Sequence, residues 1–124
     1  PGGLFTLVII PGFCLWETLL ILKGQFKTAT RRFFSGKGRT AHIEGVHFKC
    51  WYYNPGFVIR HLQKQFTMER LEGLCTLVPP SYLEAFAEKY PGLYRFLLNQ
   101  EEKRKSDWPW RSMGDYFIIS LRRK

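Results

Sequence analysis

The sequence lacks the long apolar segments of a membrane protein. Of its 124 residues, 45% are apolar, but each uninterrupted apolar run is far shorter than the roughly 20 residues of a transmembrane helix. No basic start followed by an apolar core marks a secretory signal. We expect a globular domain that buries a real core, because this apolar content is too high for a disordered tail.

Cysteine and histidine are also scarce. The chain has an odd number of cysteines, namely Cys14, Cys50 and Cys75. Their spacing fits neither a zinc site nor a disulfide framework. His42 and His47 flank a predicted turn, but two histidines without a third ligand make a poor metal site. We therefore expect free thiols, as in a reducing cytoplasm, and no metal.

Acidic residues are few, with 10 Asp and Glu against 19 Lys and Arg, which gives a formal net charge of +9. Such an excess is typical of proteins that meet nucleic acid, anionic membranes or acidic substrates. The cations cluster at 27–32, 103–105 and 122–124. Aromatic residues make up 17% of the chain, enough for a dense core or for stacking platforms.

Glycine-rich nucleotide-binding loops are missing as well. No Gly-x-Gly-x-Gly occurs, and the nearest cluster is the loop at 35–39, where two glycines lie beside two cations. This loop is not a P-loop, and no helix signal follows it. The usual cofactor-binding turn of α/β enzymes is therefore not expected in this chain.

What the sequence does contain begins with an apolar run at 4–10. It is rich in β-branched residues and ends at a proline, which is typical of a strand covered on both faces. Further strands are expected at 66–71 and 116–121. A period-two pattern at 40–53 predicts a hairpin that turns at Glu44-Gly45.

Apolar residues recur every three or four positions between Leu15 and Phe33, which predicts a helix. Gly24 predicts a kink or two shorter helices. This segment packs on the core, acts as a lid helix, or rests its basic, aromatic face on a membrane. Asn54-Pro55 predicts the start of another helix. The apolar face of that helix comprises Val58, Ile59, Leu62 and Phe66.

Two more helices are predicted before the last strand. Ser81 and Glu84 form a capping-box pattern, and the apolar face that follows comprises Leu83, Phe86, Ala87 and Tyr90. The next helix covers 93–105. Its residues expected to point inward are Leu93, Phe96 and Leu97. The order of strands and helices predicts an α/β fold.

Several motifs, in this order along the whole chain, resemble class I S-adenosylmethionine-dependent methyltransferases. Pro-Gly-Gly before the strand at 4–10 resembles the loop and fifth strand of that fold. Tyr52-Tyr53-Asn54-Pro55 resembles the Tyr-Ser/Thr-Pro entry to the next helix, and Gly114-Asp115-Tyr116-Phe117 is similar to the last strand. Other segments are similar to a bacterial small-molecule subgroup, namely Phe13, Trp16-Glu17, Arg31-Arg32 and Pro79-Pro80-Ser81-Tyr82-Leu83-Glu84.

The resemblance implies a partial Rossmann-like methyltransferase fold. It has a three-stranded mixed sheet (strands near 4–10, 66–71 and 116–121), flanking helices and an inserted hairpin near 40–53. The last strand is expected antiparallel between the other two. Residues 1–124 are then a single domain, the C-terminal part of a methyltransferase domain whose upstream cofactor-binding half is missing. The strand at 4–10 is expected to be an edge open to solvent or to self-association.

The resemblance also implies a function. S-adenosylmethionine serves the full-length parent, whereas this fragment is expected to bind no cofactor and to be inactive alone. Four aromatic residues are expected to roof a pocket for a small, lipophilic molecule, or else to belong to the core: Phe13, Trp16, Tyr52 and Tyr53. Glu17 or His42 is a candidate base, although helix electrostatics and turn exposure explain them equally well.

The residues alone leave other partners open. The stretch Lys49-Cys50-Trp51-Tyr52-Tyr53 is a candidate stacking platform for nucleic acid, although no recognised RNA-binding motif occurs. The segment from Leu15 to Phe33 is a candidate for peripheral membrane contact that feeds a lipophilic substrate. The methyltransferase interpretation itself predicts a cytoplasmic protein with a small-molecule substrate and no specific nucleic acid.

Overall fold

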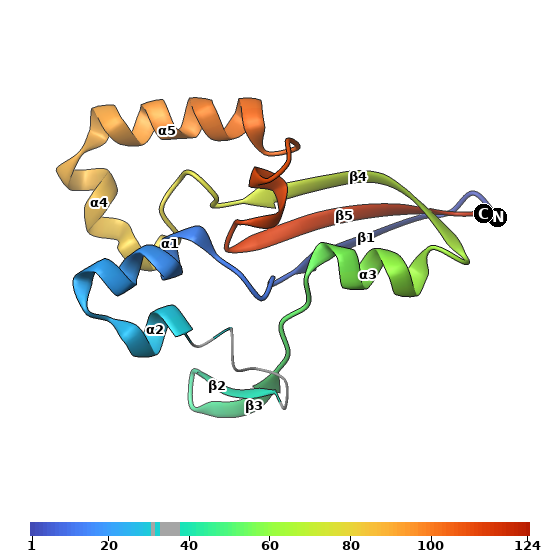
Figure 1. Ribbon diagram of the computed structural model, residues 1–124, viewed down its shortest axis with the longest axis horizontal. Coiled ribbons are helices and arrows are strands. Elements are labelled where there is room, and N and C mark those ends of the chain that lie inside the picture. Colours follow the sequence, from blue (N-terminus) through green and yellow to red (C-terminus); the bar gives the residue numbers. More distant parts are fainter. Residues whose placement is uncertain (31, 33–37) are drawn as a thin grey trace.

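The computed structural model describes residues 1–30, 32 and 38–124 (Figure 1). The strands are β1 (Leu4–Ile9), β2 (Arg39–Ile43), β3 (Val46–Cys50), β4 (Phe66–Leu74) and β5 (Tyr116–Arg123). The α-helices are α1 (Leu15–Leu19), α2 (Phe26–Thr30), α3 (Pro55–Leu62), α4 (Glu84–Lys89) and α5 (Pro91–Arg104). Short 3-10 helices are η1 (Leu20–Lys23), η2 (Ser81–Leu83) and η3 (Trp110–Ser112).

The main sheet is centred on β5, which pairs antiparallel with β1 on one side and β4 on the other. The predicted strand order is thereby confirmed. The description of this sheet as mixed is wrong, because β5 separates β1 from β4 and both pairings are antiparallel. β4 runs to Leu74, beyond the predicted end at residue 71, and Leu74 lies opposite Tyr116.

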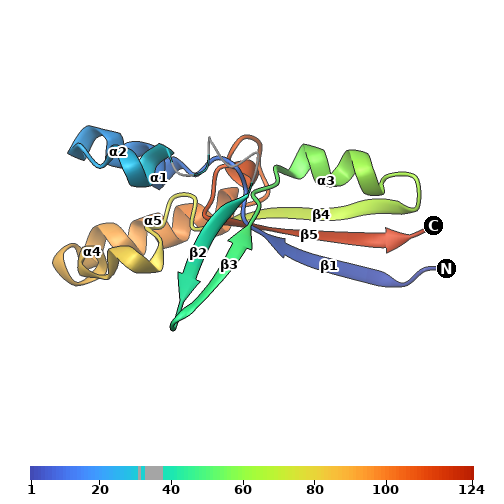
Figure 2. The ribbon, with the colours of Figure 1, turned by 90° about the horizontal axis from the view of Figure 1, so that it is seen from below.

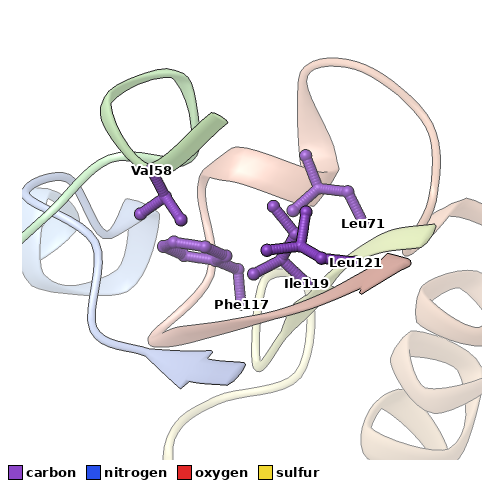
Figure 3. Packing of buried hydrophobic residues seen from close by; sticks show 5 residues of the cluster. All are labelled: Val58, Leu71, Phe117, Ile119 and Leu121. Carbon is purple, nitrogen blue, oxygen red and sulfur yellow. The ribbon is translucent and has the colours of Figure 1, made fainter. Parts of the chain in front are cut away.

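The hydrophobic core lies between α3 and one face of this sheet. Figure 3 shows Val58 of α3 against buried side chains of β4 and β5, namely Leu71, Phe117, Ile119 and Leu121. Figure 2 shows α3 lying along this face. Half-buried residues complete the cluster: Leu7, Ile9, Ile59, Leu62 and Phe66. The predicted apolar face of α3 is confirmed for Val58, Ile59 and Leu62, whereas Phe66 begins β4 instead of ending the helix.

β1 is covered on one face, not on both as its apolar sequence predicts. Leu4 and Val8 are 60% and 61% exposed, and they alternate along the strand with Leu7 and Ile9, which pack against the core. In the described part of the chain, β1 pairs with β5 alone and is an edge strand. The second face is exposed because no described helix lies along it (Figure 2).

The two ends of the chain meet at the same end of the sheet (Figure 1). The Gly2 amide donates to the Arg123 carbonyl at 3.0 Å, and the Arg123 amide donates to the Gly3 carbonyl at 2.9 Å. α1, α2 and α4 lie at the opposite end in both views (Figures 1 and 2). The termini and the helical end are therefore well separated.

The β2–β3 hairpin forms with the predicted turn. Glu44 and Gly45 both have positive φ, 48° and 84°, which gives the backbone twist that a two-residue hairpin turn needs. β3 ends at Cys50 rather than continuing to residue 53. The amide of Tyr53 instead donates to the carbonyl of Ile10 at 3.1 Å, which ties the segment after the hairpin to the end of β1.

The helical segment that begins at Leu15 is interrupted at Gly24. Of the two predictions, a kink or two shorter helices, the second is confirmed. η1 ends there with φ of 74°, and the Gly24 amide donates to the Ile21 carbonyl at 2.9 Å. Glycine adopts this left-handed conformation without the cost of a side chain. α2 then begins at Phe26. Phe33 and residues 35–37 of the predicted glycine loop lie outside the described residues.

Two predictions about the later helices are wrong. Ser81 and Glu84 form no capping box, because η2 occupies that turn and no side chain caps η2 or α4. Leu93 and Phe96 of α5 are 49% and 57% exposed rather than inward, whereas Leu97 is half-buried. The reason is that α5 projects past the sheet toward α4 (Figure 1), so it has no broad apolar surface to cover.

The remaining predictions of chemistry concern thiols, metals and membranes. All three cysteines are free. His42 and His47 lie opposite each other across the hairpin with ring centroids 4.6 Å apart, yet the described residues contain no group of three side chains able to hold a metal. Across the same residues, no helix combines the length and apolar character needed to cross a membrane.

Candidate functional site

A groove of about 510 Å³ lies between the first helical segment and α4. One wall comes from α1 and η1: Trp16, Leu19, Leu20 and Lys23. The other comes from η2 to the end of α4: Leu83, Glu84, Ala85, Phe86, Lys89 and Tyr90. This volume lies in the range of small-molecule pockets, which are mostly apolar with a few polar groups.

Helical spacing assembles the first wall. Trp16, Leu19, Leu20 and Lys23 stand at positions i, i+3, i+4 and i+7, so they share one face. Across the groove, Trp16 meets Phe86 edge to face, with centroids 5.9 Å apart and planes at 68°. Such edge-to-face pairs are favourable, so the two rings join the walls and give the groove an aromatic floor.

Charged and polar groups stand among these apolar side chains, including the exposed carboxylate of Glu84. Lys23 and Lys89 are exposed on opposite walls, and Lys89 Nζ lies 5.4 Å from the centre of the Tyr90 ring. The indole Nε1 of Trp16 is buried and finds no hydrogen-bond partner among the described residues. A buried donor without a partner costs about 1–3 kcal/mol.

A buried ion cluster holds α1 in place behind the groove. Arg32 Nε donates to Glu17 Oε2 at 2.8 Å, and Nη2 donates to Glu17 Oε1 at 2.9 Å. Nη2 also donates to Asp115 Oδ1, while Nη1 donates to the carbonyls of Pro11 and Asp115 at 3.2 and 3.1 Å. The cluster thus joins α1, the end of β1 and the start of β5.

The burial of this cluster is nearly complete, with Glu17, Arg32 and Asp115 exposed by 1%, 4% and 7%. Burial by itself lowers the pKa of Arg32, but hydrogen bonding to Glu17 and attraction to both carboxylates raise that pKa above its ordinary value. Burial also raises the pKa of the adjacent Cys14 thiol. Because Arg32 engages both oxygens of Glu17, this candidate base serves to position α1.

No family model and no curated protein matches this chain.

The structure places one of the four predicted pocket residues in the groove. That residue is Trp16. Phe13 is half-buried in the loop between β1 and α1. The residues that do not line the groove are Phe13, Tyr52 and Tyr53. Of the four, the groove therefore contains the residue on α1, and its second wall comes from η2 and α4.

The two tyrosines lie elsewhere in the fold. The half-buried ring of Tyr52 has the guanidinium carbon of Arg32 5.6 Å from its centre, a cation–π contact that adds to the ion cluster. Tyr53 is exposed and stacks on Phe57, with centroids 4.9 Å apart and planes at 18°. Both rings thus support the junction between the hairpin and α3.

Sequence reasoning missed the cationic part of the groove. Phe86 and Tyr90 were predicted to share a helix face, but that face was interpreted as core. Lys23 and Lys89 were not singled out, because each belongs to a different helix and the sequence does not show that the two helices face each other. A lysine beside the apolar stripe of each helix was the signal present.

The turn after β1 leaves no free backbone amide at Gly12 for a ligand such as S-adenosylmethionine. Such a site needs free backbone amides in a turn after a strand. In the turn after β1, the Gly12 amide is taken by Asn54 Oδ1 at 2.9 Å, and a Cβ at Gly12 would lie 3.2 Å from that same oxygen. Asn54 thus fastens the start of α3 to this turn instead of leaving the amide for a ligand.

Proposed function

We propose that this chain is the C-terminal part of a class I S-adenosylmethionine-dependent methyltransferase that acts on a small, lipophilic molecule. The observation that carries the proposal is the position of β5, antiparallel between β1 and β4. The resemblance of the motifs implied that arrangement for the last three strands. The strand order supports the assignment to this family, and the assignment itself is what we propose.

The motif before β5 supports the proposal because its residues have physical roles in this fold. Asp115 binds Arg32 with its side chain and its carbonyl. A Cβ at Gly114 would lie 2.2 Å from the carbonyl oxygen of Leu74, so β4 and β5 can approach closely here only with glycine. The Gly-Asp pair is therefore required by packing at the beginning of the last strand.

In this proposal the groove forms part of the roof of a substrate pocket. Its aromatic floor takes the apolar body of the substrate, Trp16 Nε1 donates to an acceptor on it, and Lys23 and Lys89 attract an anionic group. Methyl transfer chiefly requires that the acceptor atom be aligned and kept from water. These residues bind and orient. The methyl donor belongs to the upstream half, and residues 1–124 alone are inactive.

Calorimetry with S-adenosylmethionine tests the proposal on two proteins. The full-length protein is expected to bind the cofactor, and residues 1–124 are expected to show no binding heat. Tight binding to residues 1–124 would contradict the placement of the site. Absence of binding to the folded full-length protein would overturn the methyltransferase assignment itself.

The alternative of a nucleic-acid-binding module has one observation in its favour. Trp51 and Lys49, two positions apart, are both exposed, whereas Tyr52 and Tyr53 are engaged by Arg32 and by α3. A filter-binding titration with single-stranded RNA separates the two functions. Affinity that falls steeply with salt supports this module, and absence of binding at low salt removes it.

A further inference from the structure

The turn between η1 and α2 exposes an unusual amount of apolar surface. Leu22 is 84% exposed and Phe26 is 61% exposed, and Leu19 and Ile21 beside them are also exposed. Gly24 reverses the chain between Leu22 and Phe26. Large exposed side chains clustered within eight residues mark an interaction surface more often than a free one.

The charge of this turn has one sign. Lys23 and Lys27 are both exposed, and residues 18–30 contain no Asp or Glu. The acid just before them, Glu17, is buried against Arg32. Across the groove, α4 adds the exposed Lys89 together with the acids at 84 and 88. The turn itself thus presents apolar side chains flanked by cations.

We propose that the η1–α2 turn docks this protein on an anionic lipid bilayer. Leu22 and Phe26 enter the interface between headgroups and acyl chains, while Lys23 and Lys27 contact lipid phosphates. A bilayer is the occupant that the charges favour, because it is complementary to an apolar tip with cations beside it and needs no shaped protein partner. The net charge of +9 strengthens the same attraction.

Docking at this turn brings the groove to the membrane. Leu19 and Lys23 belong both to the exposed segment and to the groove wall, so a lipophilic molecule can pass from the bilayer to the groove along one helical surface. The docking stands by itself; only the delivery of a methyl acceptor rests on the proposed function.

Co-sedimentation with vesicles tests the docking. Vesicles of phosphatidylcholine alone are compared with vesicles containing 30% phosphatidylserine, at about 0.1 M salt, where charges are screened beyond roughly 10 Å. We expect binding to the anionic vesicles, a loss of at least tenfold in the double variant Leu22→Ser/Phe26→Ser, and weaker anionic preference in Lys23→Gln/Lys27→Gln. Both variants alter exposed side chains, so circular dichroism is expected to stay unchanged.

The matched control is Leu93→Ser/Phe96→Ser, which removes comparably exposed apolar side chains from α5 and is expected to retain binding. Equal binding by the wild type and the Leu22→Ser/Phe26→Ser variant overturns the proposal, as does absence of binding to either vesicle. Equal loss in the α5 control also overturns it. If the protein binds no vesicles but sediments as a dimer, and Leu22→Ser/Phe26→Ser abolishes that dimer, a second copy of the chain is the occupant instead.

Discussion

Glu101 binds the backbone of the loop that joins β4 to η2. Its Oε1 accepts a hydrogen bond from the Cys75 amide at 2.6 Å, and its Oε2 accepts from the Leu77 and Val78 amides at 3.1 and 2.7 Å. Hydrogen bonds to an ionised acceptor are roughly twice as strong as neutral ones. This one side chain therefore holds to α5 the loop that leads into the second wall of the groove.

Replacing Glu101 by Gln tests this role. The amide is similar in shape but has one acceptor oxygen and no charge, so we expect a loss of about 1–3 kcal/mol in the free energy of unfolding. Urea denaturation measures it. The control is Glu102→Gln, because Glu102 is exposed and pairs with Lys105 at 3.0 Å; we expect a change below about 1 kcal/mol. Equal effects of the two substitutions would contradict the role of Glu101.

Cys75 lies in the loop that Glu101 holds. Burial, followed by the negative charges of Glu101 and Asp115, raises the pKa of its thiol from 9.0 to about 11. The folded state therefore keeps a proton that the unfolded state releases, and stability falls as pH rises from 9 to about 11. In a Cys50→Ser variant, the rate of alkylation at Cys75 is expected to rise up to about pH 11. A plateau near pH 9 would contradict the shift.

At the scale of elements, close packing of β4 and β5 depends on two glycines. A Cβ at Gly73 would lie 2.7 Å from the Trp110 carbonyl oxygen, and one at Gly114 would lie 2.2 Å from that of Leu74. Both partners are backbone atoms, which cannot turn aside as a side chain can. The start of β5 and η3 are thereby held directly against β4.

Gly114→Ala is expected to lower the free energy of unfolding by about 2 kcal/mol or more, in the range of overpacked cores and strained backbones. The control is Gly92→Ala on α5, where no atom lies within 4 Å of the added carbon. Alanine favours a helix over glycine by up to about 1 kcal/mol, so the control is expected to be neutral or stabilising. Thermal denaturation compares them, and an unchanged Tm in Gly114→Ala would contradict the close approach.

Elements were predictable where local pattern decides them. The hairpin turn at Glu44-Gly45 and the break at Gly24 follow from backbone geometry that neighbouring residues encode. The exposure of Leu93 and Phe96 on α5 was not predictable, because an apolar helix face shows only that covering it would be favourable and not that another element covers it. The buried cluster was also missed, since Arg32 meets Asp115 over 83 positions of sequence, a separation that no local pattern spans.

At the scale of the whole molecule, both outer strands of the three-stranded sheet, β1 and β4, are edges in the described residues, and β1 also carries exposed apolar side chains. The strand order came from a resemblance of motifs, and it was the part of the tertiary structure that the sequence supported. Which face of β1 stays uncovered was not predictable, since the exposed Leu4 and Val8 are as apolar as the half-buried Leu7 and Ile9. Apolar pattern reports what can be buried, whereas burial also needs something to cover it.

The open edge predicts a pattern of hydrogen exchange. In β1, amides that bond to β5 are expected to exchange slowly, and the alternate amides that point away from it are expected to exchange rapidly. β5, paired on both sides, is expected to be protected at nearly every amide. NMR-detected exchange at low protein concentration measures the difference. Uniform protection along β1 would mean that a further strand covers the edge, by self-association for example.

The closeness of Gly2 and Arg123 beside the sheet makes residues 1–124, taken as an isolated domain, suited to circular permutation. Gly2 and Arg123 already share a backbone hydrogen bond, so a short peptide can join the ends without bending β1 or β5. New ends opened at the exposed turn of Glu44 and Gly45 leave the three-stranded sheet uncut. Every joint in such a rearranged chain lies away from the groove between α1 and α4.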